Sequence, residues 1–316
     1  MNHRFRFLTV LAAAGCVLAP LTQAARAIEV GSTGYKFLQM NPDASAMALG
    51  RTFSTERGGA TALAGNPAGL AGVGTVSAVV SHTEWLSTIR HEFAGAAIRR
   101  LGGVIAASFR TQSSGDIPLR TADTGGDLVG LPTPAPLGTY GGYDAALTIA
   151  YARATTLADV GGSITYAYEK IFTAESSAMC ASVGVQRHAG DLILGAVARN
   201  LGYSSKMKYE RTPLPWDIQA GAAYDRHVRD VPFRVVGDLR YAPDWYATFH
   251  LGAQATLGNV FIARAGYENG LTRTLSTAGF SGGFGFLRRG FRVDYAYQPQ
   301  RTGLGSRHVL AVAIGG

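Results

Sequence analysis

The feature that most limits the possible folds of this chain is a period-two alternation of side chains that begins at Thr75. Large apolar residues alternate with small or polar ones in segments of about 7 to 11 residues, as in strands with two different faces. In residues 144–153, for example, Leu147 and Ile149 fall on one face, and Asp144 and Thr148 fall on the other. The pattern predicts an all-β chain.

The segments number about fourteen, and an even count is what single-chain bacterial membrane barrels require. Turn-forming residues separate the segments along the chain. The predicted strands begin near Thr75, His91, Val104, Tyr143, Val160, Ala178, Asp191, Trp216, Pro232, Ala247, Asn259, Thr277, Phe291 and His308.

The connections between these segments alternate in length, and this separates a membrane barrel from a soluble β-sandwich. Both folds have alternating strands, but short turns at one rim and long loops at the other are typical of outer-membrane barrels. Residues 100–103, 189–190 and 287–290 are short connections, whereas residues 111–142, 170–177 and 201–215 are longer. Tyrosines and tryptophans near segment ends suit the interfacial girdles of such a barrel. We therefore predict a transmembrane antiparallel β-barrel in a Gram-negative outer membrane, surrounded by outer-membrane lipid.

Residues 1–27 have the composition of a secretory signal peptide, which predicts export. Arg4 and Arg6 precede an apolar run over residues 7–21, and Ala25 and Ala27 form a small-residue cleavage site. Lipidation at Cys16 is the alternative to cleavage after Ala27. Beyond residue 27 no stretch of about 18 apolar residues occurs, so no transmembrane helix is predicted.

The remaining composition argues against nucleic-acid, metal and enzyme functions. Loss of the arginines of residues 1–27 lowers the net charge from +8 to +5, and the basic residues are scattered, so no nucleic-acid partner is expected. Cys180 is the one cysteine beyond that segment, and the histidines lie singly, so no disulfide, metal site or cofactor is expected. Residues 279–283 match the Gly-x-Ser-x-Gly nucleophile motif, but they lie in an alternating segment and not between a strand and a helix. We predict a protein that is not an enzyme.

Residues 28–73 lack the alternation and form a separate region. Asn66 before Pro67 is a helix-start signal, and Gly72 is placed to end that turn. We predict that residues 28–73 form a plug inside the barrel of residues 74–316, with a periplasmic extension as the alternative. Its plug motif is Asn66, Pro67, Ala68 and Gly69.

Charged residues on the small or polar faces of the strands are predicted to point into the lumen. A charge that faces lipid near the midplane costs about 2 to 4 kcal/mol, which favours the inward orientation. These residues either form a salt-bridge network that fills the lumen or line a substrate path. The candidates are Asp144, Glu169, Asp217, Arg234, Asp238, Arg240, Arg292 and Asp294.

An ordered series of short motifs resembles the PorV/PorQ-like family of FadL-type outer-membrane barrels. The series includes Asn66-Pro67-Ala68-Gly69-Leu70-Ala71, Arg199-Asn200-Leu201-Gly202, Arg264-Ala265-Gly266-Tyr267 and Asp294-Tyr295-Ala296-Tyr297. The resemblance implies a fourteen-stranded barrel with an N-terminal plug that carries the Asn-Pro-Ala element. The strand number implied by the family equals the number of alternating segments.

These observations lead to two hypotheses for the function. The first is a non-enzymatic scaffold or shuttle in protein secretion or surface attachment, whose outer loops, above all residues 111–142, contact secreted cargo or secretion-system proteins. The alternative is a FadL-like transporter of hydrophobic small molecules across the outer membrane. A deep apolar cavity beneath Phe37, Leu38 and Met40 would favour the transporter, whereas a lumen lined by charge would count against it.

Overall fold

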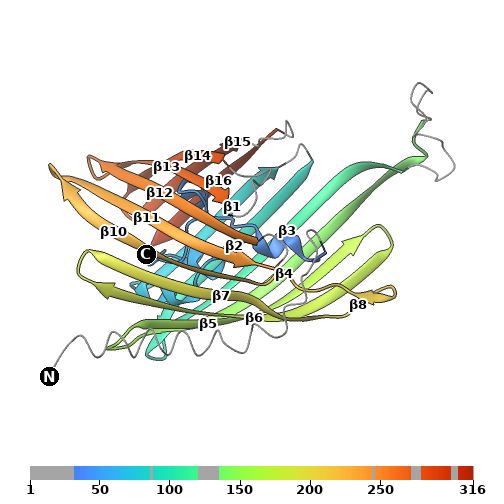
Figure 1. The fold of residues 1–316 in the computed structure, drawn as a ribbon, viewed down its shortest axis with the longest axis horizontal. Coiled ribbons are helices and arrows are strands. Elements are labelled where there is room, and N and C mark those ends of the chain that lie inside the picture. The colour runs from blue at the N-terminus through green and yellow to red at the C-terminus, as the bar shows by residue number, and fades with distance from the viewer. Residues whose placement is uncertain are drawn as a thin grey trace.

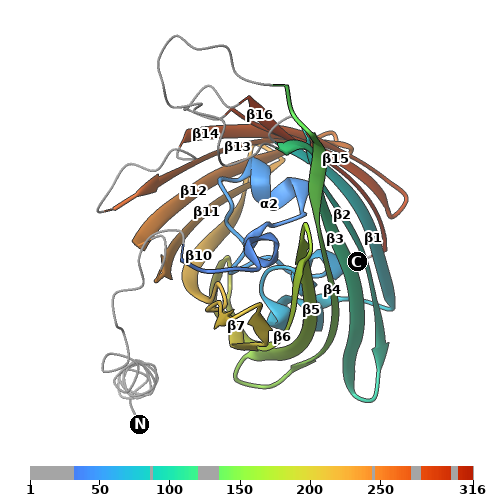
Figure 2. The same cartoon turned by 90° about the vertical axis from the view of Figure 1, so that its right-hand side faces the viewer.

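The chain folds into one closed antiparallel barrel of fourteen strands, which confirms the predicted fold class (Figures 1 and 2). The computed structural model describes residues 32–85, 88–119, 135–243, 246–271, 279–299 and 305–315. Closure comes from pairing of the first and last strands, with Ser77 opposite Gly315 and Glu84 opposite His308. The barrel strands are β1 (Val76–Trp85), β2 (Ile89–Arg100), β3 (Gly103–Leu119), β4 (Gly138–Ala154), β5 (Asp159–Ile171), β6 (Ala174–Ala189), β7 (Leu192–Ser204), β10 (Asp217–Val228), β11 (Val231–Ala242), β12 (Tyr246–Leu257), β13 (Phe261–Gly270), β14 (Gly279–Arg288), β15 (Phe291–Pro299) and β16 (Ser306–Gly315).

The side chains of the strands are sorted with the large apolar ones outside. On β4, Leu147 is 54% exposed and Ile149 is 58% exposed, while the alternating Ala146, Thr148 and Ala150 are buried. A soluble protein buries its large apolar residues, whereas a barrel in lipid presents them outward. The outer surface therefore fits an outer-membrane barrel. No helix in the described residues is long and apolar enough to cross a membrane.

Two predicted loops are shorter in the structure. Strands β3 and β4 extend to Leu119 and Gly138, past a bulge between Ser114 and Ile117, so pairing occupies much of the loop predicted at residues 111–142. Backbone pairing continues beyond the apolar band because it does not need large outward side chains. The loop predicted at residues 170–177 is a tight turn, in which Phe172 has a φ of 54°. Residues 120–134, at the centre of the first loop, and the predicted signal peptide lie outside the described residues.

A second difference is a small hairpin that the alternation does not predict. Strands β8 (Lys206–Met207) and β9 (Glu210–Arg211) pair with each other in the connection from β7 to β10 and not with the barrel. After this hairpin, Leu214 is 4% exposed and packs among side chains from inside the barrel. The backbone oxygen of Pro213 accepts a hydrogen bond from Gly34 N at 3.1 Å. This connection therefore reaches into the lumen.

Residues 32–73 lie inside the barrel as four short helical turns joined by extended backbone (Figure 2). The turns are η2 (Lys36–Gln39), α2 (Ala44–Ala48), η3 (Ala60–Leu63) and η4 (Pro67–Gly72). The Asp43 carboxylate caps α2 by accepting from the backbone N–H groups of Ser45 and Ala46. The Asn66 side chain caps η4 in the same way, accepting from Ala68 N at 3.1 Å.

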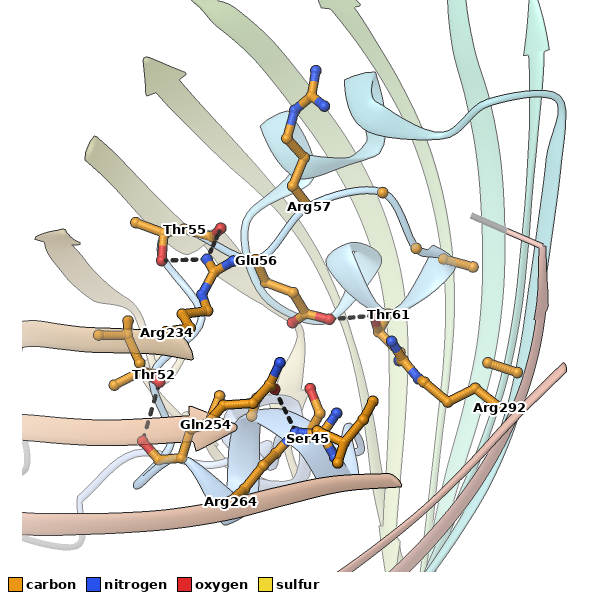
Figure 3. A pocket seen from close by; sticks show the side chains of 18 of the residues that line it. Ser45, Thr52, Thr55, Glu56, Arg57, Thr61, Arg234, Gln254, Arg264 and Arg292 are labelled. Carbon is orange, nitrogen blue, oxygen red and sulfur yellow. Dashed lines mark hydrogen bonds between the residues drawn. The ribbon is translucent and has the colours of Figure 1, made fainter. Parts of the chain in front are cut away.

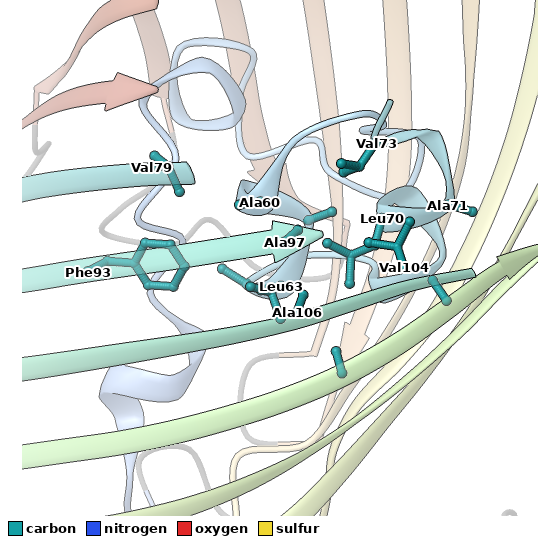
Figure 4. Close-up of a cluster of buried hydrophobic side chains, with 14 residues drawn as sticks. Ala60, Leu63, Leu70, Ala71, Val73, Val79, Phe93, Ala97, Val104 and Ala106 are labelled. Carbon is teal, nitrogen blue, oxygen red and sulfur yellow. The ribbon is translucent and has the colours of Figure 1, made fainter. Parts of the chain in front are cut away.

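Apolar side chains fasten this N-terminal segment to two neighbouring parts of the wall, one formed by β1 to β4 and the other by β4 to β6. Leu63 and Leu70 of the segment pack with Val79, Phe93 and Val104 of β1, β2 and β3 (Figure 4). A second cluster joins Tyr35, Phe37 and Leu38 to Cys180 and Leu214, among others. Because the lumen is closed to lipid, these clusters are the hydrophobic core of the molecule.

Candidate functional site

The lumen contains a network of buried charges centred on the contact between the N-terminal segment and the wall. Asp238 of β11 accepts hydrogen bonds from the backbone N–H groups of Phe53 (2.9 Å) and Ser54 (3.0 Å). The Ser54 hydroxyl (2.6 Å) and the Gln219 amide (2.6 Å) also donate to this carboxylate. One carboxylate therefore fixes two consecutive residues of the segment.

Next to Asp238 lies an ion-pair cluster formed by β7, β10 and β11. Both oxygens of Asp217 accept hydrogen bonds from Arg199, at 2.9 and 2.7 Å, and Arg240 donates to one of them at 2.9 Å. Arg199 also donates to the backbone oxygen of Ala64 at 3.0 Å, and its guanidinium lies 4.1 Å from the centre of the Phe53 ring. The cluster thus ties the wall to the segment at two further points.

The Asn66 motif lies against inward glycines of the wall. The Asn66 amide donates to Ser54 O at 2.7 Å and to Ala196 O at 3.3 Å. A Cβ at Gly184 of β6 would lie 1.9 Å from the Asn66 side-chain oxygen, and a Cβ at Gly195 of β7 would lie 2.1 Å from Ser54 O. Only glycine permits this approach of wall and segment.

At the end of the lumen with the longer connections, two further candidates accept hydrogen bonds, one from the N-terminal segment and one from the wall. Glu169 accepts a hydrogen bond from Tyr35 N at 2.7 Å, and Asp144 accepts one from the Gln112 amide at 3.0 Å. Asp144 and Glu169 are directly opposite in the β4–β5 ladder. The Tyr35 hydroxyl bonds to Ser176 at 2.5 Å.

A cavity of about 330 Å³ opens at the end with the short turns (Figure 3). Arg234, Arg264 and Arg292 of the wall line it, together with Glu56 and Arg57 of the segment. Each of these arginines has a carboxylate partner, and Asp294 serves two of them, Arg264 at 2.7 Å and Arg292 at 2.6 Å. Hydroxyl and amide groups also line it, beside apolar side chains such as Leu49, Val236 and Ile262, so this cavity suits a molecule with both polar and apolar parts.

Glu56 has an unusual titration. Burial, together with the charge of the neighbouring Asp43, raises the pKa of Glu56 well above its ordinary value. The Thr61 hydroxyl donates a hydrogen bond to one oxygen of Glu56. A hydrogen bond shared with the Asp43 carboxyl also raises the pKa of Glu56. The protonated form of Glu56 therefore extends toward neutral pH.

Five of the candidates contact the N-terminal segment or belong to the ion-pair cluster. Asp238, Glu169 and Arg234 contact the segment, and the Arg234 guanidinium donates to Thr55 O at 3.0 Å. Asp217 and Arg240 belong to the ion-pair cluster. Asp144 is bonded to the wall, and Arg292 and Asp294 lie at the cavity. The sequence named Arg199 and Arg264 only within the motifs of the family resemblance and gave them no lumenal role. It did not identify His250 or Glu268, of which Glu268 lies 3.5 Å from both Arg51 and His250. Arg264 and Glu268 are four positions apart on the polar face of β13, so alternation alone identifies them as inward.

The described lumen has the charged lining that was expected to count against a transporter. Phe37 and Leu38 are packed in an apolar cluster, and the lumenal cavity described above is lined largely by charged and polar groups. Among the described residues no group of His, Cys, Asp and Glu could hold a metal ion. Ser281 of the Gly-x-Ser-x-Gly run lies on strand β14, where its hydroxyl accepts from Gly50 N at 3.2 Å.

Solved structures with a similar fold include two proteins described as toluene transporters and one described as a hydrocarbon channel. TbuX of Ralstonia pickettii, described as a toluene transporter, is 12% identical with a TM-score of 0.59, over 87% of this chain and 98% of its own. The Pseudomonas putida toluene transporter TodX is 11% identical with a TM-score of 0.60, over 85% and 95%. CymD, a monoaromatic hydrocarbon channel, is 12% identical with a TM-score of 0.51, over 92% and 97%.

At these identities the likeness shows the fold, which is that of the FadL-type outer-membrane barrels. No family model and no curated relative matches the sequence. The localisation predicted from the sequence, the outer membrane, is confirmed.

Proposed function

We propose that this protein is a channel that carries a small organic molecule across the outer membrane. The observation that carries the proposal is a lumen occupied by a separate chain segment, with a cavity of about 330 Å³ between segment and wall. A filled lumen excludes bulk solutes, while a segment held by discrete contacts is able to rearrange for a ligand. Residues 28–73 act in this proposal as the plug, and Asn66 with Pro67 anchors it.

The comparisons favour this function over the scaffold or shuttle. The similar structures named above carry descriptions as toluene transporters or as a hydrocarbon channel. The PorV/PorQ-like shuttle stays a prediction that none of these comparisons supports, and residues 120–134 of its main contact loop lie outside the described residues. Secreted cargo and secretion-system partners belong to that prediction.

Uptake by intact cells tests the proposal. The protein is expressed in a Gram-negative host without a FadL-type barrel, and the rate of radiolabelled toluene uptake is compared with that of the empty host. We expect faster uptake with the protein present. In a variant that fills the cavity, Ala313→Trp, uptake should fall toward the host rate, since Ala313 lines that cavity.

The matched control is Ala255→Trp, because Ala255 is opposite the outward Phe233 on the lipid face and its replacement leaves the lumen unchanged. Surface expression of each variant is measured by protease accessibility of intact cells. Uptake at the host rate with properly inserted protein would contradict the proposed function.

A further inference from the structure

The outer face of the barrel carries exposed arginines at the end with the short turns. Every second strand of the antiparallel barrel runs toward this end, and five of these strands have an outward arginine among their last three residues. The five strands are β2, β4, β6, β10 and β14, and the first four of them occupy every second place in one continuous arc of the wall. We call these residues the arginine belt: Arg100, Arg153, Arg187, Arg226 and Arg288.

The arginine belt lies at the depth of the lipid headgroups. Each arginine follows, two positions later on the same face, an exposed large apolar or aromatic side chain; these are Ile98, Tyr151, Val185, Tyr224 and Phe286. Such side chains face the edge of the hydrocarbon, and a long basic side chain just beyond them reaches the headgroups. Because the short turns of outer-membrane barrels face the periplasm, the belt meets the periplasmic leaflet.

The strand register gives the arginine belt no charge of opposite sign. The residues opposite its members in the next strand are glycine or apolar: Gly103, Val160, Leu194, Phe233 and Phe291. Throughout the part of the chain that the structure describes, no carboxylate forms an ion pair with any of the five guanidinium groups. Arg226 donates to the Tyr224 hydroxyl at 2.8 Å and lies within electrostatic range of Asp191 in the turn from β6 to β7.

Outward charges at the end with the longer connections are arranged differently. There Glu84 is opposite Arg90, and Lys170 is opposite Glu175. Glu92 is likewise opposite His82, whose Nδ1 lies 2.6 Å from its carboxylate. Opposite charges across a strand pair stabilise each other. The chain thus supplies partners for these outward charges at one end, whereas the arginine belt at the other end is left to anions of its surroundings.

The charges of the short turns favour a lipid over a periplasmic protein as the source of those anions. The turns carry Arg229 and Arg289 but also Asp191 and Asp230, so their charges balance. A protein that approached the rim from the periplasm would meet both signs of charge. A lipid beside the outer face of the described strands meets the arginines without an acidic neighbour on that face, which is complementary to an anionic headgroup.

We propose that the arginine belt binds the phosphate groups of anionic phospholipids in the periplasmic leaflet and so selects these lipids at the barrel surface. A guanidinium donates two parallel hydrogen bonds to phosphate oxygens, and a headgroup without an ammonium leaves the phosphate charge uncompensated. The inference goes beyond the proposed function and does not depend on it, because the belt lies on the outer face and not in the lumen.

Spin-labelled lipids test the proposal on the full-length protein in phosphatidylcholine vesicles. Electron paramagnetic resonance separates lipids slowed at the barrel surface from bulk lipids, and so compares the association of phosphatidylglycerol with that of phosphatidylcholine. We expect phosphatidylglycerol to associate at least about twofold more strongly at low salt, and this excess to shrink at about 1 M salt. In Arg100→Gln/Arg153→Gln/Arg187→Gln, which removes three of the five arginines, the excess should fall by about half or more.

The matched control is Arg90→Gln/Lys170→Gln/Lys206→Gln, which removes three exposed cations at the opposite end and should keep the excess. An equal loss in this control would assign the excess to net charge and reject the proposal.

Equal association of the two lipids with the unaltered protein would also reject it and leave an acidic protein as the partner of the belt. An excess unchanged in the belt variant would reject it as well. The shift in gel mobility on heating verifies that each variant is folded, and Arg100→Gln/Arg153→Gln takes the place of the triple variant if that variant does not fold.

Discussion

At the scale of single residues, the lumen is held together by charges that accept or donate several hydrogen bonds at once. Asp238 accepts from Phe53, Ser54 and Gln219, so its charge is satisfied entirely by groups of the protein. Hydrogen bonds to charged groups contribute about 1.5 to 3 kcal/mol each, more than neutral ones. Asp238 is therefore the residue whose loss should most weaken the position of the N-terminal segment.

Replacing Asp238 by alanine should release residues 53 and 54. We expect amide hydrogen exchange at Phe53 and Ser54 to speed up at least about a hundredfold, because two charged hydrogen bonds at about 1.5 to 3 kcal/mol each are lost. Hydrogen-exchange mass spectrometry on the detergent-solubilised protein measures this. Asp225→Ala is the matched control, since that carboxylate is 44% exposed and contacts only the wall. Equal exchange in both variants would refute the role of Asp238.

Glu56 should make the position of the segment depend on pH. Its pKa in the folded protein is raised above the ordinary value of 4.5, so the folded state holds the proton more tightly than the unfolded one. Stability is then greatest below the unfolded pKa and falls as pH rises toward the folded pKa. We expect faster exchange of segment amides at pH 8 than at pH 5, after correction for intrinsic rates, and a smaller difference in Glu56→Gln. The same pH dependence in that variant would assign it to another group.

At the scale of elements, the strands were predictable and the connections only partly so. Alternation located all fourteen barrel strands, because each must present apolar side chains to lipid and polar ones to the lumen. It did not locate β8 and β9, which have two residues each and no membrane face. The extensions of β3 and β4 were also missed, because pairing outside the lipid leaves no periodic apolar signal.

The close packing of residues 32–73 against the wall should depend on glycines of the inward faces. Replacing Gly184 by valine would place side-chain carbon within the volume of the Asn66 side chain, 1.9 Å from its oxygen at the Cβ alone. We expect the barrel to form and the segment to become sensitive to protease. Gly162→Val on neighbouring β5 is the control, because its nearest atom to a new Cβ is 3.7 Å away. A protected segment in Gly184→Val would mean that the close contact is dispensable.

At the scale of the whole molecule, the barrel closes through β1 and β16 independently of the segment inside it. The ladder runs unbroken from Ser77 opposite Gly315 to Glu84 opposite His308, and none of its backbone bonds involves residues 32–73. The wall is therefore complete without residues 32–73. Closing the barrel gives the backbone groups of the edge strands hydrogen-bond partners in lipid. The packing of residues 32–73 inside the barrel is a separate event.

Deletion of residues 32–73 should leave an inserted barrel with an open lumen. We expect the deleted protein to conduct ions steadily in planar bilayers and the full chain to conduct far less, because the segment occupies the lumen. Single-channel recording measures both, and a gel shift on heating verifies that the deleted barrel is folded. Equally low conductance in the two proteins would show that wall side chains alone close the lumen.

The sequence by itself determined the barrel, its fourteen strands and which faces point inward, because lipid imposes a local rule on every strand. It also marked eight lumenal charges and the Asn66 cap. Only the tertiary structure decided the partners: that Arg199 and Arg240 share Asp217, and that Arg264 and Arg292 share Asp294. Alternation fixes the face of a side chain, whereas the partner depends on the register of strands and on the path of residues 32–73 inside the barrel.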